Sequence, residues 1–274
     1  MGDVLRRLLR SPQGIIGLVL VVLVLIVAVF GPSLAPYEPS AMSVLRRYKP
    51  PSADHWLGTD QLGRDILSRI LSGARATVLL ALLATVIGSL TGALIGTASA
   101  FLGGRVDEAV MRTVDAIMAM PSLLMSLLIV SVLGRGSENA VLAIAIAFTP
   151  GMARITRSVA LSVRRQDFVN AAIARGEGGW YIVVREMLPN VVAPIVVEMS
   201  IRVAFAVMLF ATLSFLGLGA QPPASEWGLM VSEARRFMHL SPWMIVWPCG
   251  AIALVAIGFN LLGDGLRDAL NPRT

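Results

Sequence analysis

Glu198 and Arg202 are ionisable side chains inside an apolar stretch that begins after Pro189 and continues to about Leu218. Residues four apart share one face of a helix, so this carboxylate and this guanidinium can pair. Ionisable groups inside a membrane are costly and often mark a polar pathway. Two roles are open on sequence grounds: a group on a polar pathway or at a contact between subunits, or a local ion pair near the cytoplasmic end of the helix.

The other candidates for chemistry lie outside the apolar stretches and form no reactive group. His55 and His239 lack the paired histidine or cysteine spacing of a metal site. Asp60 and Asp65 fit the capping of a helix beside the membrane better than acid–base chemistry. No nucleophile elbow and no phosphate-binding glycine loop occurs in the sequence. We therefore expect no catalytic residue, no metal and no cofactor bound by this chain.

The composition is that of a membrane protein. Of 274 residues, 56% are hydrophobic and 15% are charged, against roughly 45–50% and about 25% in soluble domains. The single cysteine, Cys249, excludes a disulfide scaffold, and the apolar excess excludes a disordered chain. The net charge of +6 comes from arginines placed as ones and twos between apolar runs. Membrane proteins place basic residues at helix ends in this way, so we expect no nucleic-acid partner.

Six apolar stretches can cross a bilayer, which needs about 20 residues per helix. They lie at residues 14–31, 76–104, 116–134, 139–153, 189–218 and 242–263. The first is predicted to be an uncleaved helix rather than a signal peptide, because its apolar run is too long. The fourth should extend past Arg154, and Pro121 should kink the third. Gly88, Gly92 and Gly96 should let another helix approach the second closely.

Basic residues indicate the orientation of these helices. With the N-terminus inside, thirteen of the 23 basic residues fall in cytoplasmic segments and nine in outer segments, which is the bias of membrane proteins. Both termini are then cytoplasmic, and the long loop after the first helix faces outward. We divide the chain into residues 1–73, the first helix and this loop, and residues 74–274, the transmembrane domain.

The cytoplasmic loop over residues 160–190 carries the clearest signal. Asp167 is predicted to cap a short helix over 168–175 that Gly176 stops, and a second short helix over 180–188 should end at Pro189. A helix this short is unstable alone, so it needs a surface to lie on. The groove of a partner protein would supply one; its own bundle or the lipid headgroups are the alternative. Its apolar face comprises Phe168, Ala171, Ala172 and Ile173.

At this loop the sequence resembles a known family. Asn170-Ala171-Ala172, with Gly176 and then Leu188-Pro189, is similar to the cytoplasmic EAA motif of ABC importer permeases, which forms a coupling helix in a cleft of the ATPase subunit. Residues 55–75, 213–228 and 259–268 resemble, in order, segments of the C-type subunit of dipeptide, oligopeptide and nickel importers. That family usually has Glu where this chain has Asn170, so an ion pair made by that Glu cannot form here.

The resemblance implies an all-α permease of the bacterial inner membrane. Six transmembrane helices would form the MetI-like five-helix core of a type I ABC importer, preceded by one N-terminal helix. The implied partners are a second, homologous permease in a heterodimer, two ABC ATPase subunits that bind and hydrolyse the ATP, an extracytoplasmic substrate-binding protein and membrane lipid. The implied ATPase-coupling residues are Phe168, Asn170, Ala171, Ala172, Gly176, Leu188 and Pro189.

Two points stay open at the level of sequence. Di- or oligopeptides are the implied cargo, but nickel and other small solutes use permeases with the same motifs. A self-sufficient secondary transporter is a rival class; such proteins often show inverted repeats and intramembrane carboxylates, whereas this chain has no visible repeat and Glu198 alone as a candidate carboxylate. An intramembrane hydrolase is disfavoured because the required residues are absent.

Overall fold

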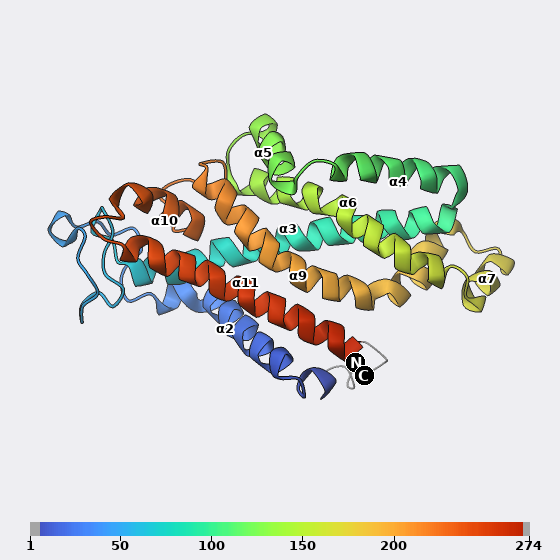
Figure 1. The fold of residues 1–274 in the computed structure, drawn as a ribbon, viewed down its shortest axis with the longest axis horizontal. Coiled ribbons are helices and arrows are strands. Elements are labelled where there is room, and N and C mark those ends of the chain that lie inside the picture. Colours follow the sequence, from blue (N-terminus) through green and yellow to red (C-terminus); the bar gives the residue numbers. More distant parts are fainter. Residues whose placement is uncertain (1–5, 271–274) are drawn as a thin grey trace.

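The computed structural model describes residues 6–270, and the ordered elements of this range are helices. Figure 1 shows long helices that lie side by side along one axis. In chain order the α-helices are α2 (Pro12–Leu34), α3 (Ile66–Leu102), α4 (Gly104–Met118), α5 (Ser122–Leu133), α6 (Ser137–Val163), α7 (Asp167–Ala174), α8 (Gly179–Tyr181), α9 (Leu188–Phe215), α10 (Trp227–Ala234) and α11 (Trp243–Leu270). A π-helical segment, Ile182–Met187, joins α8 to α9, and Val44–Arg46 and Arg235–Phe237 are short 3₁₀ turns.

The described residues contain five helices that are long and apolar enough to span a membrane, and a bent pair that makes a sixth candidate. They occur in the predicted order. The fourth does extend past Arg154, to Val163. The second begins at Ile66, ten residues earlier than predicted, because Asp65 caps it by accepting a 2.8 Å hydrogen bond from the backbone N–H of Ser68. The prediction considered only the uncharged run and so missed about three helical turns, which contain Arg69.

The predicted third span is present as a bent pair of helices, and the bend at Pro121 is a break rather than a kink within one helix. The chain breaks between Met118 and Ser122, and α4 and α5 meet at 90°. Pro121 occupies the N-cap of α5, where its missing N–H costs no helical hydrogen bond. Ion pairs from Asp107 to Arg157 and from Asp115 to Arg154 tie α4 to α6. These pairs hold α4 along α6, and after the 90° turn α5 packs on α6 as well.

Close packing of α3 on α6 forms the centre of the bundle. A Cβ atom at Gly88 would lie 2.6 Å from the Ala145 carbonyl oxygen, and one at Gly92 would lie 2.5 Å from the Thr149 carbonyl oxygen. Real Cβ atoms do not approach backbone so closely, so any larger residue would push the helices apart. The prediction that this glycine stripe packs against another helix is confirmed.

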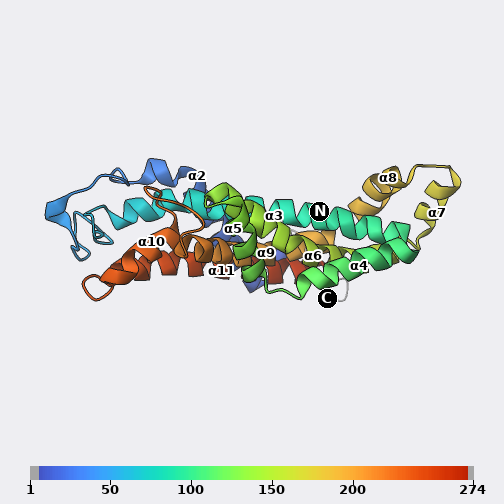
Figure 2. The ribbon, with the colours of Figure 1, turned by 90° about the horizontal axis from the view of Figure 1, so that it is seen from above.

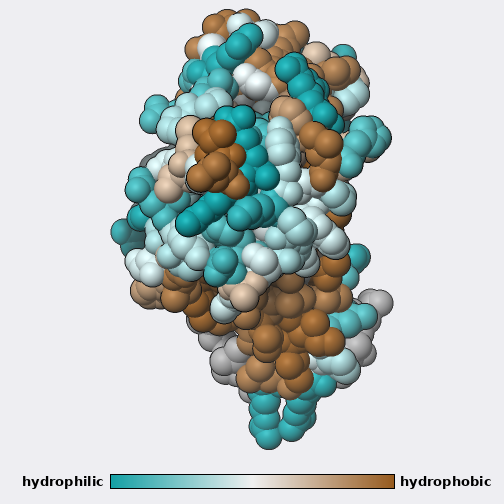
Figure 3. Space-filling model, turned by 90° about the vertical axis from the view of Figure 1, so that its left-hand side faces the viewer, coloured by the Kyte–Doolittle hydropathy of each residue, from teal (hydrophilic) through white to brown (hydrophobic). Residues whose placement is uncertain are grey.

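The two ends of the bundle differ. The loop end holds residues 35–65 and α10, and the α7 end holds α7 and α8 (Figure 1). Figure 3 looks onto the loop end, where hydrophilic side chains cover most of the upper part above an apolar flank. Beneath this surface Arg69, only 1% exposed, donates hydrogen bonds of 2.7 Å to Asp60 and 3.0 Å to Glu233. Arg64 contacts the same two carboxylates, so the loop is fixed to α10.

Candidate functional site

Helix α7 projects from its end of the bundle (Figures 1 and 2) and contacts the π-helical segment Ile182–Met187. Gly176 follows it with φ +79°. The N–H of Gly176 donates to the Ile173 carbonyl at 2.9 Å, and the N–H of Glu177 donates to the Ala172 carbonyl at 3.2 Å. This pair of bonds is the Schellman stop, which favours glycine because of its left-handed backbone. The predicted stop at Gly176 is confirmed.

The predicted N-cap of α7 is wrong by one residue. Gln166 holds that position with extended backbone and no side-chain hydrogen bond to the helix. Asp167 is instead the first helical residue. There its carboxylate lies near the positive end of the helix dipole, an interaction of about 0.3–1 kcal/mol. An aspartate is favourable both at the N-cap and in the first turn of a helix. The residue type alone therefore does not show which of these two positions Asp167 occupies.

One face of α7 packs on the bundle and the other is free. Val169 and Ala172 are fully buried, in a cluster with Ile182 and Met187 of the π-helical segment. Asn170 and Ala171 are exposed on the opposite face. Of the remaining predicted coupling residues, Phe168 and Leu188 are half-buried against the same cluster, and Gly176 and Pro189 are exposed. The predicted residues therefore divide between an exposed face and the cluster that supports it.

The prediction that a separate helix ends at Pro189 is wrong. Helix continues without a break from Gly179 to Phe215, through the π-helical segment Ile182–Met187. Proline has no N–H to donate to the carbonyl of residue 185, so the α-helical bonding cannot continue there. A π-helical segment immediately before it accommodates this change within one helix, as such segments often do at functional sites. The α7 end is thus connected directly to the membrane-spanning α9.

Sequence reasoning missed an exposed aromatic pair on α8, at the α7 end of the bundle. Trp180 is 68% exposed and Tyr181 is also exposed, as is Ile173 on the outer side of α7. Arg175, whose guanidinium lies 3.3 Å from a Glu186 carboxylate oxygen, connects α7 to the π-helical segment. Large exposed apolar side chains on a protruding end mark a contact surface. The signal available in the sequence was the aromatic pair directly after two glycines.

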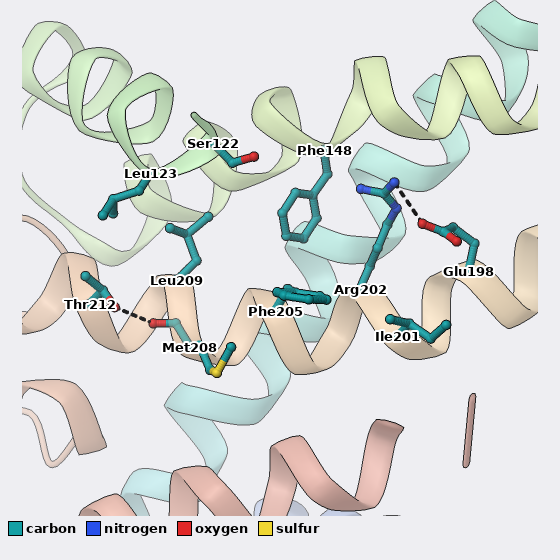
Figure 4. Close-up of a pocket in the computed structure, with 10 residues that line it drawn as sticks. All are labelled: Ser122, Leu123, Phe148, Glu198, Ile201, Arg202, Phe205, Met208, Leu209 and Thr212. Carbon is teal, nitrogen blue, oxygen red and sulfur yellow. Dashed lines mark hydrogen bonds and ion pairs between the residues drawn. The ribbon is translucent and has the colours of Figure 1, made fainter. Parts of the chain in front are cut away.

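The second candidate site is a pocket of about 360 Å³ between α5, α6 and α9 (Figure 4). Nη2 of Arg202 lies 2.9 Å from Oε1 of Glu198, so the ion pair forms as its spacing predicts. The pair lies in the middle of α9 rather than near its end. The guanidinium carbon lies 5.5 Å from the centre of the Phe148 ring, within the range of a cation–π interaction.

The other polar candidates serve the structure of the loop end. Nδ1 of His55 lies 2.9 Å from Oδ1 of Asp65, and both side chains are buried. Glu226 caps α10 by accepting hydrogen bonds from the N–H groups of Gly228 and Leu229. Burial raises the pKa of the Glu226 carboxyl. Within residues 6–270, no three His, Cys, Asp or Glu side chains converge as a metal site would require.

The family described as the binding-protein-dependent transport system inner membrane component matches residues 88–274. The chain belongs to this family. A second description, the N-terminal transmembrane domain of oligopeptide transport permease C, matches residues 1–51. The chain is therefore a permease subunit of a transport system that depends on a binding protein and lies in a membrane.

Relatives of the permease align with nearly its whole length. A probable D,D-dipeptide transport system permease of Escherichia coli is 41% identical over 263 residues, 96% of this chain and 88% of the relative. The dipeptide transport permease of Alkalihalophilus pseudofirmus and the oligopeptide transport permease of Bacillus subtilis are each 38% identical over 271 residues, 99% of this chain and 89% of the relative.

A solved structure shares the fold of the permease. A chain of the methionine ABC transporter MetNI, in an inward-facing conformation, superposes with a TM-score of 0.57 at 16% identity, over 74% of this chain and 96% of that chain. The permease thus has the MetI-like fold of ABC importers together with an N-terminal helix, α2.

Proposed function

We propose that the permease carries di- or oligopeptides across the bacterial inner membrane as one half of an ATP-driven importer. The observation that carries this proposal is the alignment over nearly the whole chain with permeases named for dipeptide and oligopeptide transport. A homologous second permease would complete the pathway in a heterodimer. An extracytoplasmic binding protein would deliver the peptide, and two ATPase subunits would bind and hydrolyse ATP.

The exposed face of α7 is the proposed ATPase contact. Asn170, Ala171 and Ile173 are exposed on α7, and Trp180 and Tyr181 are exposed on α8 at the same end of the bundle. A short helix presenting apolar residues suits a groove in a partner. Because Asn170 is uncharged, the contact would rest on shape and apolar burial rather than on an ion pair at that position.

The proposed mechanism follows from the connection between α7 and α9. ATP binding would close the ATPase pair, draw the two coupling helices together and open the permeases outward; hydrolysis would reset them inward. Residues 179–215 form one unbroken helix, so a displacement at α7 reaches the pocket around Arg202. In this orientation the α7 end and both termini are cytoplasmic, which the basic residues Arg164, Arg165 and Arg175 at that end favour.

The test is ATP-dependent uptake by the reconstituted complex. The tagged permease is isolated in mild detergent from its native membranes, its partners are identified by mass spectrometry, and the complex is placed in proteoliposomes with its binding protein. Uptake of a radiolabelled dipeptide that requires ATP supports the proposal. Uptake of nickel alone would reassign the cargo. Transport by the isolated chain, driven by an ion gradient without ATPases, would contradict the mechanism.

A further inference from the structure

The pocket between α5, α6 and α9 combines opposite charges with an apolar wall. Its polar lining is Glu198, Arg202, Ser122 and Thr212, and the rest is formed by aliphatic and aromatic side chains. Figure 4 shows the guanidinium of Arg202 extending from α9 toward α6, with the Phe148 ring on one side and the Glu198 carboxylate on the other. A volume of about 360 Å³ lies within the usual range of small-molecule sites.

Arg202 has more hydrogen-bonding capacity than the pocket uses. A guanidinium carries five N–H donors, and the carboxylate of Glu198 accepts from one of its terminal nitrogens. The Nε atom is buried and has no acceptor within residues 6–270. Gly151 of α6 leaves room for the guanidinium, since a Cβ there would lie 2.9 Å from Nη2 of Arg202. The guanidinium of Arg202 therefore has N–H groups left that could donate hydrogen bonds to a further anionic partner.

The start of α5 supplies additional donors beside this arginine. The first N–H groups of an α-helix have no partner within the helix, and no side chain caps α5 at Pro121. Ser122, the first residue of α5, lines the pocket together with Arg202, and the same two residues line a smaller cavity of about 120 Å³ beside it. Helix N-termini favour anions, so this corner of the pocket suits a carboxylate.

A zwitterion can replace the Glu198–Arg202 pair, whose side chains are 26% and 16% exposed, without leaving either charge alone. An unpaired charge inside a membrane is costly, but a ligand with one carboxylate and one ammonium would give each side chain a new partner. When the ligand leaves, the pair closes again. Such an exchange keeps binding weak enough for release, as a translocation pathway requires.

The spacing of the pair suits a short peptide. The Cα atoms of residues four apart on a helix are separated by about 6 Å along its axis, and two extended residues span about 7 Å. Once their 2.9 Å contact opens, the two side chains can therefore reach the two ends of a dipeptide. We propose that this pocket is a transit site for dipeptides, in which Arg202 binds the terminal carboxylate and Glu198 binds the terminal ammonium. The inference rests on the peptide import proposed above and adds to it a contact site and a preference for dipeptides.

The chain offers a matched control for this site. Glu108 and Arg112 of α4 form another ion pair of the same residue types at the same spacing, but their side chains are 58% and 78% exposed and outside the pocket. The reconstituted complex is prepared with Arg202→Gln, Glu198→Gln, Arg112→Gln or Glu108→Gln. Uptake of a radiolabelled dipeptide and ATPase activity stimulated by the loaded binding protein are measured for each, per assembled complex.

We expect Arg202→Gln and Glu198→Gln to lower dipeptide uptake about tenfold, the effect of losing a hydrogen bond to a charged group, while stimulated ATPase activity persists. The two control variants should change neither quantity. Unchanged uptake in both pocket variants would overturn the inference. A parallel fall of uptake and ATPase activity would also overturn it, because the pair would then hold a conformation or the second permease.

If the pocket variants do not assemble, photolabelling of the wild-type complex tests whether the dipeptide occupies the pocket. A dipeptide with a diazirine-bearing leucine analogue is illuminated during ATP turnover by the wild-type complex, and the labelled residues are mapped. Label at Phe148 or within residues 201–209 is expected, and label found only elsewhere would refute the site. If the wild-type complex takes up no peptide at all, the failure belongs to the proposed function and not to the pocket.

Discussion

Substitution of Gly176 should separate ATPase coupling from folding of the bundle. The residue has φ +79°, and beyond its chain neighbours no atom of residues 6–270 lies within 4 Å of the position that a Cβ would occupy. A side chain there meets no other part of the described chain, so its cost is backbone strain. That strain is roughly 1–2 kcal/mol for an ordinary residue and higher for a β-branched one, whereas Asn tolerates the left-handed region.

The expected effect therefore grows in the order Gly176→Asn, Gly176→Ala and Gly176→Val. A cost of about 2 kcal/mol raises the population of an opened α7 stop by about thirtyfold. Because α7 lies at the end of the bundle, membrane insertion should be unaffected. Binding of the ATPase subunits and stimulated ATP hydrolysis should fall, least for Asn and most for Val.

Gly217 is a matched control at the loop end. It has φ +78° and an equally open Cβ position. Its N–H donates to the Ser214 carbonyl and the N–H of Leu218 to the Leu213 carbonyl, both at 2.9 Å, which is the same Schellman stop after α9. Gly217→Val should lose a similar amount of stability while the ATPase subunits remain bound.

The assay is affinity isolation of each variant complex from membranes, followed by ATPase measurement and a thermal unfolding curve. Normal ATPase binding by Gly176→Val would show that the stop is unimportant. Loss of binding by Gly176→Asn as well would show that the partner approaches this glycine closely, and that backbone conformation is not the cause. Equal loss of ATPase binding in Gly217→Val would attribute the effect to general destabilisation.

Three further perturbations test other parts of the molecule. Asn170→Glu adds a carboxylate in the first turn of α7, worth about 0.3–1 kcal/mol, and should preserve or strengthen ATPase binding in affinity isolation; loss of assembly would mean that the partner groove requires the amide. Burial raises the pKa of the Glu226 carboxyl, so the folded chain keeps that proton to a higher pH than the unfolded chain does. Thermal unfolding should therefore show stability falling as pH rises from the ordinary carboxyl pKa toward the raised folded pKa, and Glu226→Gln should flatten that slope; an identical slope would contradict the assignment. Gly92→Val places a side chain against the Thr149 carbonyl, so it should lower membrane levels of the protein by disrupting α3–α6 packing, whereas normal levels would show that the helices can separate.

The spans were predictable because hydropathy is a property of contiguous residues. The order of the apolar stretches, the Gly176 stop and the packing role of Gly88, Gly92 and Gly96 all depend on local composition or on a fixed spacing. Prediction from contiguous residues failed where a residue far along the chain neutralises a charged side chain. Helix α3 includes Arg69, whose charge Asp60 and Glu233 neutralise, and Glu233 lies 164 residues further along the chain.

The predictions made from proline were the second source of error. At one proline the helix is interrupted more than predicted, and at the other it is interrupted less. Pro121 was expected to kink a helix but begins a new one at 90°, whereas Pro189 was expected to end a helix but lies inside one. In both places the missing N–H is the same, and the neighbouring packing decides the outcome. Ion pairs hold α4 against α6 before Pro121, while Met187 and Val191 remain buried on either side of Pro189.

The π-helical segment and the pocket residues Glu198 and Arg202 belong to one continuous helix, which connects the α7 loop to the pocket. From Gly179 to Arg202 the unbroken helix covers about 35 Å at 1.5 Å per residue. A π-helical segment is a local widening of the helix that often marks functional sites. This one contacts α7, and its Ile182 and Met187 share a buried cluster with Val169 and Ala172 of α7. A force on the exposed face of α7 therefore acts on the π-helical segment before it reaches α9. Because Glu198 and Arg202 lie on that same helix, a shift of α9 against α5 and α6 changes the shape of the pocket without breaking the ion pair, whose two residues move together.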